Sequence, residues 1–133
     1  MSNLQTIRDF IHECGVYYLA TVEGDQPRVR PFGTAEIFED KLYIQTGKVK
    51  PVSKQISQNP KVEISCCKDG KWLRLTGVLA NDDRVEAKRD MLEKNPTLKA
   101  MYDAEDDNTQ VLYFEKGTAT FSSFTEAPYT IEI

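Results

Sequence analysis

Short segments rich in β-branched and aromatic residues recur along this 133-residue chain, and turn-forming residues separate them. Such segments are typical of β-strands. The predicted strands are 16–22, 26–38, 41–46, 61–67, 71–80, 111–114, 117–124 and 129–133. Helical patterns alternate too rarely with these strands for a parallel sheet built from strand–helix–strand units. The spacing therefore predicts a small antiparallel barrel with peripheral helices, which is a mainly β, α+β fold.

Three segments carry helix signals. Residues 2–14 have an amphipathic pattern that opens with a capping box at Ser2, and Gly15 suits the left-handed residue that ends such a helix. A second helix is predicted to begin at Pro51, and a third covers residues 83–94. A chain of this length can bury one hydrophobic core, so we expect a single domain over residues 1–133.

The charge balance argues against nucleic-acid and membrane partners. There are 17 basic and 21 acidic residues, which give a formal net charge of −4, and no long basic run is present. No apolar run approaches the length of a transmembrane helix, and the N-terminus lacks a signal-peptide pattern. We therefore expect a cytoplasmic protein that binds neither nucleic acid nor membrane.

The cysteine pattern argues against a metal site. Cys66 and Cys67 are adjacent in a predicted strand, so their side chains point to opposite faces and cannot share an ion. No CxxC motif and no nearby histidine accompanies them. We interpret them as structural thiols, on a strand whose two faces are both at least partly covered.

The stretch from Arg28 to Lys54 has the composition of an anion site. Arg28 and Arg30 lie two residues apart in a predicted strand, so they point to the same face. Lys50 and Lys54 flank Pro51, which suits the first position of a helix. A helix N-terminus offers N–H donors and a positive dipole end, and here cations and the Thr46 hydroxyl surround it. The pattern favours a phosphate, although solvated surface cations remain the alternative.

Side chains for catalysis by the protein alone are missing from the sequence. His12 is the single histidine, and it lies on the first predicted helix beside the apolar stripe. A triad or a transition-metal centre needs more partners than this. The sequence has neither a GxGxxG nor a Walker motif. If the protein catalyses a reaction, a bound cofactor must supply the chemistry while the chain binds and orients it.

The chain as a whole resembles the small members of the pyridoxamine 5′-phosphate oxidase-like, FMN-binding split-barrel family. The resemblance is carried by the order and spacing of the segments 18–22 (YLATV), 26–32 (QPRVRPF), 42–46 (LYIQT), 50–55 (KPVSKQ), 59–62 (NPKV) and 72–77 (WLRLTG). It implies a six-stranded antiparallel split barrel with peripheral helices. It also implies a homodimer with two FMN sites at the subunit interface.

The resemblance implies a role for specific residues of this chain. In the family, an arginine of the second strand and residues of the following turn and helix hold the FMN phosphate. These positions are matched here by Arg30 or Arg28, and by Thr46, Lys50 and Lys54. The flavin ring lies along the backbone of the second strand, which here is Val29, Pro31 and Phe32. Trp72 matches a position that meets the flavin from the partner subunit.

The resemblance implies an FMN-dependent oxidoreductase in which hydride passes to or from flavin N5 and an unknown small-molecule substrate. Residues 128–133 (PYTIEI) lack the arginine and histidine that hold pyridoxal phosphate in the true oxidase, so that reaction is not expected. The sequence leaves two alternatives open. One is a flavin-binding electron carrier or flavin store without turnover, and the other is the same fold with a deazaflavin or a haem.

Overall fold

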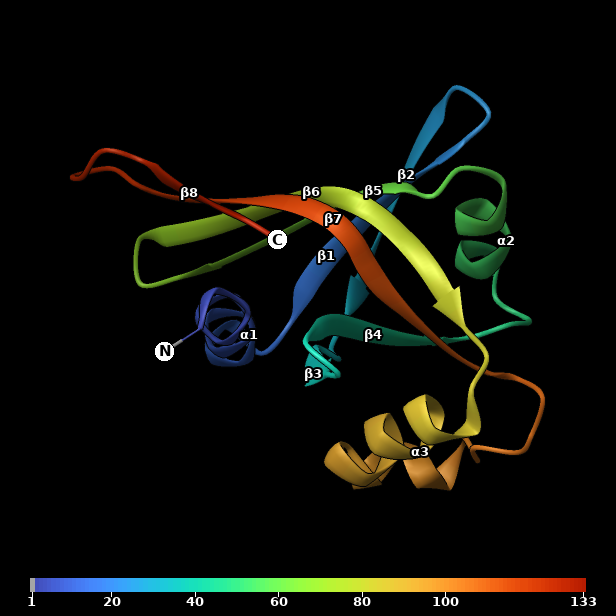
Figure 1. Ribbon diagram of the computed structural model, residues 1–133. Helices are drawn as coiled ribbons and strands as arrows, with labels where there is room; N and C mark the ends of the chain where they lie inside the picture. Colours follow the sequence, from blue (N-terminus) through green and yellow to red (C-terminus); the bar gives the residue numbers. More distant parts are fainter. Residues whose placement is uncertain (1) are drawn as a thin grey trace.

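The computed structural model describes residues 2–133, shown in Figure 1. Its helices are α1 (Asn3–Cys14), α2 (Pro51–Gln58) and α3 (Val85–Lys94), with a 3₁₀ helix, η1 (Pro96–Ala100). Its strands are β1 (Tyr17–Glu23), β2 (Gln26–Phe32), β3 (Glu36–Phe38), β4 (Lys41–Gly47), β5 (Lys61–Lys68), β6 (Lys71–Asp82), β7 (Thr109–Ser123) and β8 (Tyr129–Glu132). The predicted helices are confirmed to within a few residues of their ends.

The strands form one antiparallel sheet in the order β2-β1-β5-β6-β7-β4-β3, with β8 paired to β7. Strands β2 and β3 lie at the two ends of this order, so the sheet is open rather than closed into a barrel. The mainly β fold with peripheral helices is confirmed. The expected count of six strands is wrong, because the described residues form eight.

The predicted strand 26–38 is two strands in different parts of the sheet. β2 pairs with β1, whereas β3 pairs with β4. The chain crosses between them through Thr34, whose Oγ1 accepts a hydrogen bond from the N–H of Gln45 at 2.9 Å and whose carbonyl accepts one from the Tyr17 hydroxyl at 2.6 Å. Pro31 lies in β2, an edge strand, where a residue without an N–H is tolerated.

The segments predicted as strands 111–114 and 117–124 are one continuous strand, β7. The two segments looked separate in the sequence because β7 has an irregularity between them. There, the β6–β7 register shifts between Val78 and Leu79. Gly77 sits beside the shift, where an added Cβ would lie 2.6 Å from the carbonyl oxygen of Lys116. The absence of a side chain at Gly77 therefore allows the two strands to approach each other.

The main core lies between α1 and the inner faces of the strands. Ile7 and Ile11 of α1 are fully buried against residues such as Leu19, Ile64 and Leu73. The capping box of α1 is confirmed, since the Ser2 hydroxyl accepts a hydrogen bond from the N–H of Gln5 at 3.1 Å, and Gly15 ends the helix at a φ of 82°. No helix among residues 2–133 is long and apolar enough to cross a membrane.

Figure 1 shows α1 and α3 on one side of β5, β6 and β7. The thiols of β5 reflect this arrangement, because Cys66 is buried in the core while Cys67, on the opposite face, is exposed. Within one chain, the face of β5 that bears Cys67 is therefore uncovered at this residue, and the predicted cover on both faces is not found there. The same outer face also presents Tyr18 and Val29, which are 52% and 68% exposed.

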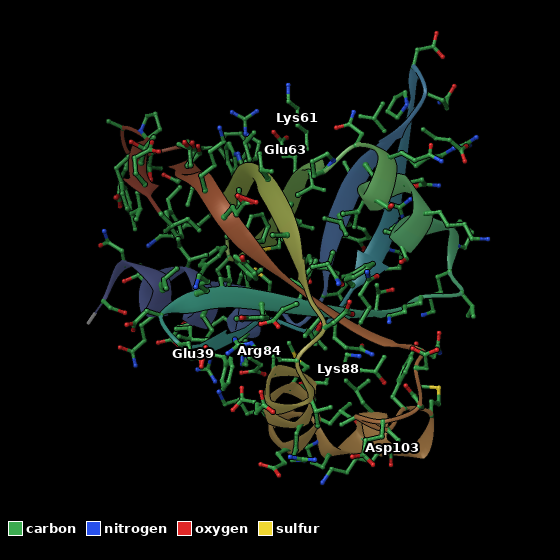
Figure 2. The ribbon with its side chains drawn as sticks, turned by 45° about the vertical axis from the view of Figure 1, so that its right-hand side comes forward. Glu39, Lys61, Glu63, Arg84, Lys88 and Asp103 are labelled. Atoms are coloured by element: carbon green, nitrogen blue, oxygen red, sulfur yellow. The ribbon has the colours of Figure 1, made fainter. Side chains whose placement is uncertain are left out.

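A buried carboxylate fastens α3 to the sheet. Asp82, at the end of β6, accepts a hydrogen bond from the Tyr43 hydroxyl at 2.7 Å and three from the Arg84 guanidinium at 2.9, 3.1 and 3.3 Å. Arg84 also pairs with Glu39 of the β3–β4 turn at 2.7 Å, and Figure 2 shows these two side chains side by side. Arg84, and secondarily Tyr43, lower the pKa of Asp82 from 3.8 to about 2.

Asp82 should therefore make stability depend on pH. Its pKa is lower in the folded protein than in the unfolded chain, so its contribution is complete above about pH 4 and is lost as the pH falls toward 2. The shift corresponds to roughly 2 kcal/mol. We expect Asp82→Asn to lower the free energy of unfolding by about that amount at pH 7 and by almost nothing near pH 2, measured by urea denaturation. Asp25→Asn, at an exposed turn, is the control and should change neither value.

Candidate functional site

A groove of about 460 Å³ opens where β2, β4 and η1 meet. Such a volume suits a small molecule or part of a cofactor. The lining residues come from four segments of the chain: Pro31, Phe32, Gly33 and Thr34; Gln45 and Thr46; Lys50; and Asn95, Thr97, Leu98, Met101 and Tyr102. Four of the residues expected from the sequence, Pro31, Phe32, Thr46 and Lys50, are therefore brought together at one place.

The Thr46 hydroxyl is the unusual feature of this groove. Thr46 is 97% buried on β4, and its Oγ1 has no hydrogen-bond partner. The neighbouring polar side chains do have hydrogen-bond partners. Gln110 lies opposite Thr46 in the sheet, and its side chain accepts a hydrogen bond from the Ser53 hydroxyl at 2.6 Å. Leaving a buried hydroxyl unpaired costs on the order of 1–3 kcal/mol, so such groups are rare in folded proteins.

Arg30 and Arg28 share a face of β2 but have different surroundings. Arg28 is half exposed and pairs with Glu23 across the β1–β2 hairpin at 2.9 Å. Arg30 donates to the Leu19 carbonyl at 3.2 Å, to the Thr21 hydroxyl at 2.8 Å and to the Gln55 side chain of α2 at 2.5 Å. All three acceptors are neutral. Burial lowers the pKa of Arg30, and the charge of Arg28 adds to this effect.

The turn that leads into α2 is held by backbone hydrogen bonds and by Asn108. The Asn108 carbonyl accepts from Lys48 at 2.7 Å, and its side chain accepts from the N–H of Val49 at 3.2 Å. Pro51 occupies the first helical turn, as predicted, and the N-cap residue Lys50 makes no side-chain cap. The Lys50 ammonium is therefore not used to cap the helix and is free to contact a ligand.

The cations around the turn divide into paired and unpaired groups. Lys48 lies within 3.5 Å of two carboxylates, those of Asp83 and Asp107. Within residues 2–133, no ion pair includes Arg30, Lys50 or Lys54. Lys50 lines the groove, whereas Lys54 is exposed one helical turn further along α2. These three positive charges have no carboxylate to balance them locally.

Five of the residues expected at the site do not line the groove: Arg28, Val29, Arg30, Lys54 and Trp72. Val29 is 68% exposed and sits on the outer face of β2, away from Arg30. Trp72, at the start of β6, packs against Phe124 with a ring separation of 5.1 Å. Neither residue lines the groove. Within one chain, then, Trp72 takes no part in this site, and its expected contact from a partner subunit stays a prediction.

The contribution of η1 was missed by the sequence analysis. Asn95 begins this segment, and its side chain donates to the buried Glu36 carboxylate at 3.0 Å and to the Met91 carbonyl at 3.1 Å. Tyr102 packs over Gly47, where an added Cβ would lie 3.1 Å from the Tyr102 hydroxyl. The Asn95-Pro96 break was visible in the sequence, but no local signal shows that the residues after it fold over β4.

Comparison with known proteins shows which family has this fold. The sequence model described as pyridoxamine 5′-phosphate oxidase matches residues 4–115. The chain belongs to this family. Among solved structures, a NimC/NimA family protein from Clostridium acetobutylicum is 50% identical, with a TM-score of 0.95 over 98% of this chain and 92% of that chain. No protein with a curated function matches the sequence.

Less similar proteins with the same fold bind different cofactors. A pyridoxamine 5′-phosphate oxidase-related, FMN-binding protein from Nostoc punctiforme has a TM-score of 0.64 at 15% identity, over 98% of this chain and 92% of that chain. A haem-binding protein from Mycobacterium smegmatis has a TM-score of 0.72 at 15% identity, over 98% of this chain and 58% of that chain. At these identities the likeness shows the fold alone, so the cofactor must be argued from the groove itself.

The unpaired Thr46 hydroxyl gives a stability prediction. Thr46→Val keeps the side-chain shape and removes the buried, unsatisfied oxygen. We expect the ligand-free protein to be more stable by about 1 kcal/mol, measured by urea denaturation. Thr21→Val is the matched control, because the Thr21 hydroxyl is buried and hydrogen-bonded to both Arg30 and Gln55. That variant should lose stability, and a loss of the same size in both variants would contradict the assignment.

Proposed function

We propose that this protein is an FMN-dependent oxidoreductase, and that the groove between β2, β4 and η1 holds the flavin. The proposal is carried by one observation, the buried and unpartnered Thr46 hydroxyl at a groove that Lys50 lines, where Lys50, like Arg30 and Lys54, has no carboxylate partner within residues 2–133. A phosphate group would supply the acceptor for the hydroxyl and the negative charge for the cations. Membership of the pyridoxamine 5′-phosphate oxidase family supports the proposal.

The chemistry of the donor set fits an FMN phosphate. Thr46 and Lys50 line the groove, and Lys54 follows on the first turns of α2. Arg30 approaches the same helix through Gln55. Hydrogen bonds from such cations to a phosphate are charge-assisted and roughly twice as strong as neutral ones. Because Arg28 is already paired with Glu23, Arg30 is the better candidate of the two arginines.

An edge strand, β2, borders the part of the groove where the flavin ring would lie. β2 pairs with β1 alone, so alternate backbone N–H and C=O groups of β2 face away from the sheet. Pro31 and Phe32 line the groove at this strand, and Pro31 cannot donate a hydrogen bond. Leu98 and Met101 of the opposite wall supply apolar contact. We propose that the ring lies between β2 and this wall.

Bound FMN would supply reversible transfer of hydride or single electrons at flavin N5. The groove lining contains no carboxylate and no histidine, and its titratable members are Lys50 and Tyr102. The role of the chain is therefore to bind, to orient and to exclude water, rather than to move protons for a substrate. This observation also favours a second candidate, a flavin-binding electron carrier without substrate turnover. Anaerobic reduction of the bound flavin by NADH or NADPH separates the two.

The position of His12 favours FMN over haem. A haem held through histidine needs a ring nitrogen that faces the haem. His12 is the single histidine of the chain, and its Nε2 lies 2.6 Å from the Ala35 carbonyl oxygen, in hydrogen-bond contact, and 3.6 Å from the Glu36 carboxylate. It is carried by α1 and does not line the groove. The visible absorption spectrum of the purified protein distinguishes flavin from haem directly.

The phosphate assignment predicts that the protein distinguishes FMN from riboflavin. A charge-assisted hydrogen bond contributes about 1.5–3 kcal/mol, so Arg30→Ala, Lys50→Ala and Lys54→Ala should each weaken FMN binding by roughly ten- to a hundredfold. Riboflavin, which lacks the phosphate, should bind weakly to the wild type and respond little to these changes. The measurement is a pair of flavin titrations on each variant.

The control for these titrations is Lys48→Ala, which removes a cation of the same turn that is already paired with carboxylates. It should change FMN affinity by less than threefold. Thr46→Val should weaken FMN binding as well, although it stabilises the ligand-free protein. Equal losses for FMN and riboflavin, or no loss for either, would show that the turn does not hold a phosphate.

We further propose that the functional unit is a homodimer in which the partner's Trp72 completes the flavin site. The outer sheet face with the exposed Tyr18 and Val29 supports it, as does the partly buried Trp72 packed against the exposed Phe124. Arg30→Ala and Trp72→Ala homodimers should each bind FMN poorly. A mixed dimer, purified with two affinity tags, should regain one intact site. No recovery on mixing, or a stable monomer in sedimentation at micromolar concentration, would contradict this arrangement.

A further inference from the structure

A second concave site lies between α1 and the β7–β8 hairpin, on the core side of the sheet. In Figure 1, α1 lies below the paired ends of the β5–β6 and β7–β8 hairpins. The cleft there has a volume of about 300 Å³. It is lined by Thr6, Asp9, Phe10 and Glu13 of α1, by Lys71, by Phe121, Ser122 and Ser123 of β7, and by Glu126, Ala127 and Tyr129. This volume is at the lower end of the range for small-molecule sites.

Three aromatic rings form one wall of this cleft. Phe10 meets Phe121 edge-on, with ring centres 5.5 Å apart and planes at 83°. Phe121 in turn stacks on Tyr129, with centres 5.1 Å apart and planes at 13°. One face of the Tyr129 ring is thus covered by Phe121, while the residue remains 54% exposed. The negative face of such a ring attracts cations, and the apolar wall contacts an organic body.

Carboxylates from two separate elements surround the same cleft. Asp9 and Glu13 come from α1, and Glu126 comes from the β7–β8 hairpin. Asp9 is paired with Arg8 at 2.9 Å. Within residues 2–133, neither Glu13 nor Glu126 takes part in an ion pair. Lys71 is the single cationic residue of the lining, so the cleft as a whole is negative.

We infer that this cleft binds a small organic cation with an apolar body, of the arylalkylammonium class. The apolar body lies against Phe10, Phe121 and Tyr129, and the ammonium lies between Glu13 and Glu126. Charge complementarity selects this occupant, because a neutral apolar molecule leaves both carboxylates unpaired and an organic anion is repelled by them. The cleft and the flavin groove share no residue, so this inference does not depend on the cofactor.

Three matched probes test the charge requirement: 4-phenylbutylammonium, 4-phenylbutan-1-ol and 4-phenylbutanoate. They share the apolar body and differ at one end, so their affinities compare charge alone. We expect the ammonium to bind at least tenfold more tightly than the alcohol and the carboxylate not to bind, measured by NMR titration at low ionic strength. Equal affinities for all three probes, or binding of none, would overturn the proposal.

Variants of the lining locate the binding. Glu13→Gln and Glu126→Gln should each reduce ammonium affinity about fivefold and leave alcohol affinity unchanged. Tyr129→Ala should weaken both probes, and its fold is checked by urea denaturation. Glu115→Gln is the matched control, because Glu115 is an exposed carboxylate of β7 outside the cleft. An equal effect of Glu115→Gln would show long-range attraction by the net charge of the protein rather than a site.

Discussion

The long antiparallel pair of β6 and β7 is the interaction on which the rest of the structure depends. The two strands run together from Lys71 opposite Ser123 to Asp82 opposite Val111. Gly77 and the register shift next to it let the pair bend without separating. One end of the pair reaches the acidic cleft and the Trp72–Phe124 rings, and the other end reaches Asp82 and pairs with β4, which lines the groove. Both candidate sites are thus positioned by one rigid element.

The groove contains a polar group that lowers the stability of the ligand-free protein and that a bound ligand would satisfy. A buried, unpaired hydroxyl at Thr46 is unfavourable in the ligand-free protein, and Arg30, Lys50 and Lys54 nearby along the chain have no carboxylate partner among the described residues. Natural sequences keep such unfavourable groups chiefly where a ligand satisfies them. The contrast with Lys48 and Arg28 supports this interpretation, because those cations belong to the same segment and each has carboxylate partners. The unpaired hydroxyl and the cations without carboxylate partners belong to the segments where we place the phosphate.

The two concave sites have opposite electrostatic character. The groove has Lys50 and no carboxylate in its lining, whereas the cleft has three carboxylates and one lysine. The formal net charge of −4 conceals this separation. Local charge governs which ligands enter a site, since at physiological ionic strength screening removes interactions beyond about 8 Å. The two occupants that we propose, an anionic cofactor in the groove and an organic cation in the cleft, match this separation of charge.

The sequence by itself determined the local structure and the components of the groove. β-branched runs, the Asp69-Gly70 turn, the Ser2 cap and Pro51 set the elements, because each acts through its immediate neighbours. The order of the motifs was enough to predict the family, and with it the residues that meet at Thr46 and Lys50. Pro31, Phe32, Thr46 and Lys50 line one groove because they belong to adjoining segments of the chain.

The tertiary structure alone decided the features that depend on distant partners. Whether Arg28 or Arg30 keeps a free charge depends on Glu23 and Gln55, which the spacing of the arginines does not reveal. The strand predicted over 26–38 divides because its two halves pair with different partners, β1 and β4. The η1 wall and the acidic cleft likewise join segments far apart in sequence. Strand pairing and burial bring such residues together, and no local pattern encodes them.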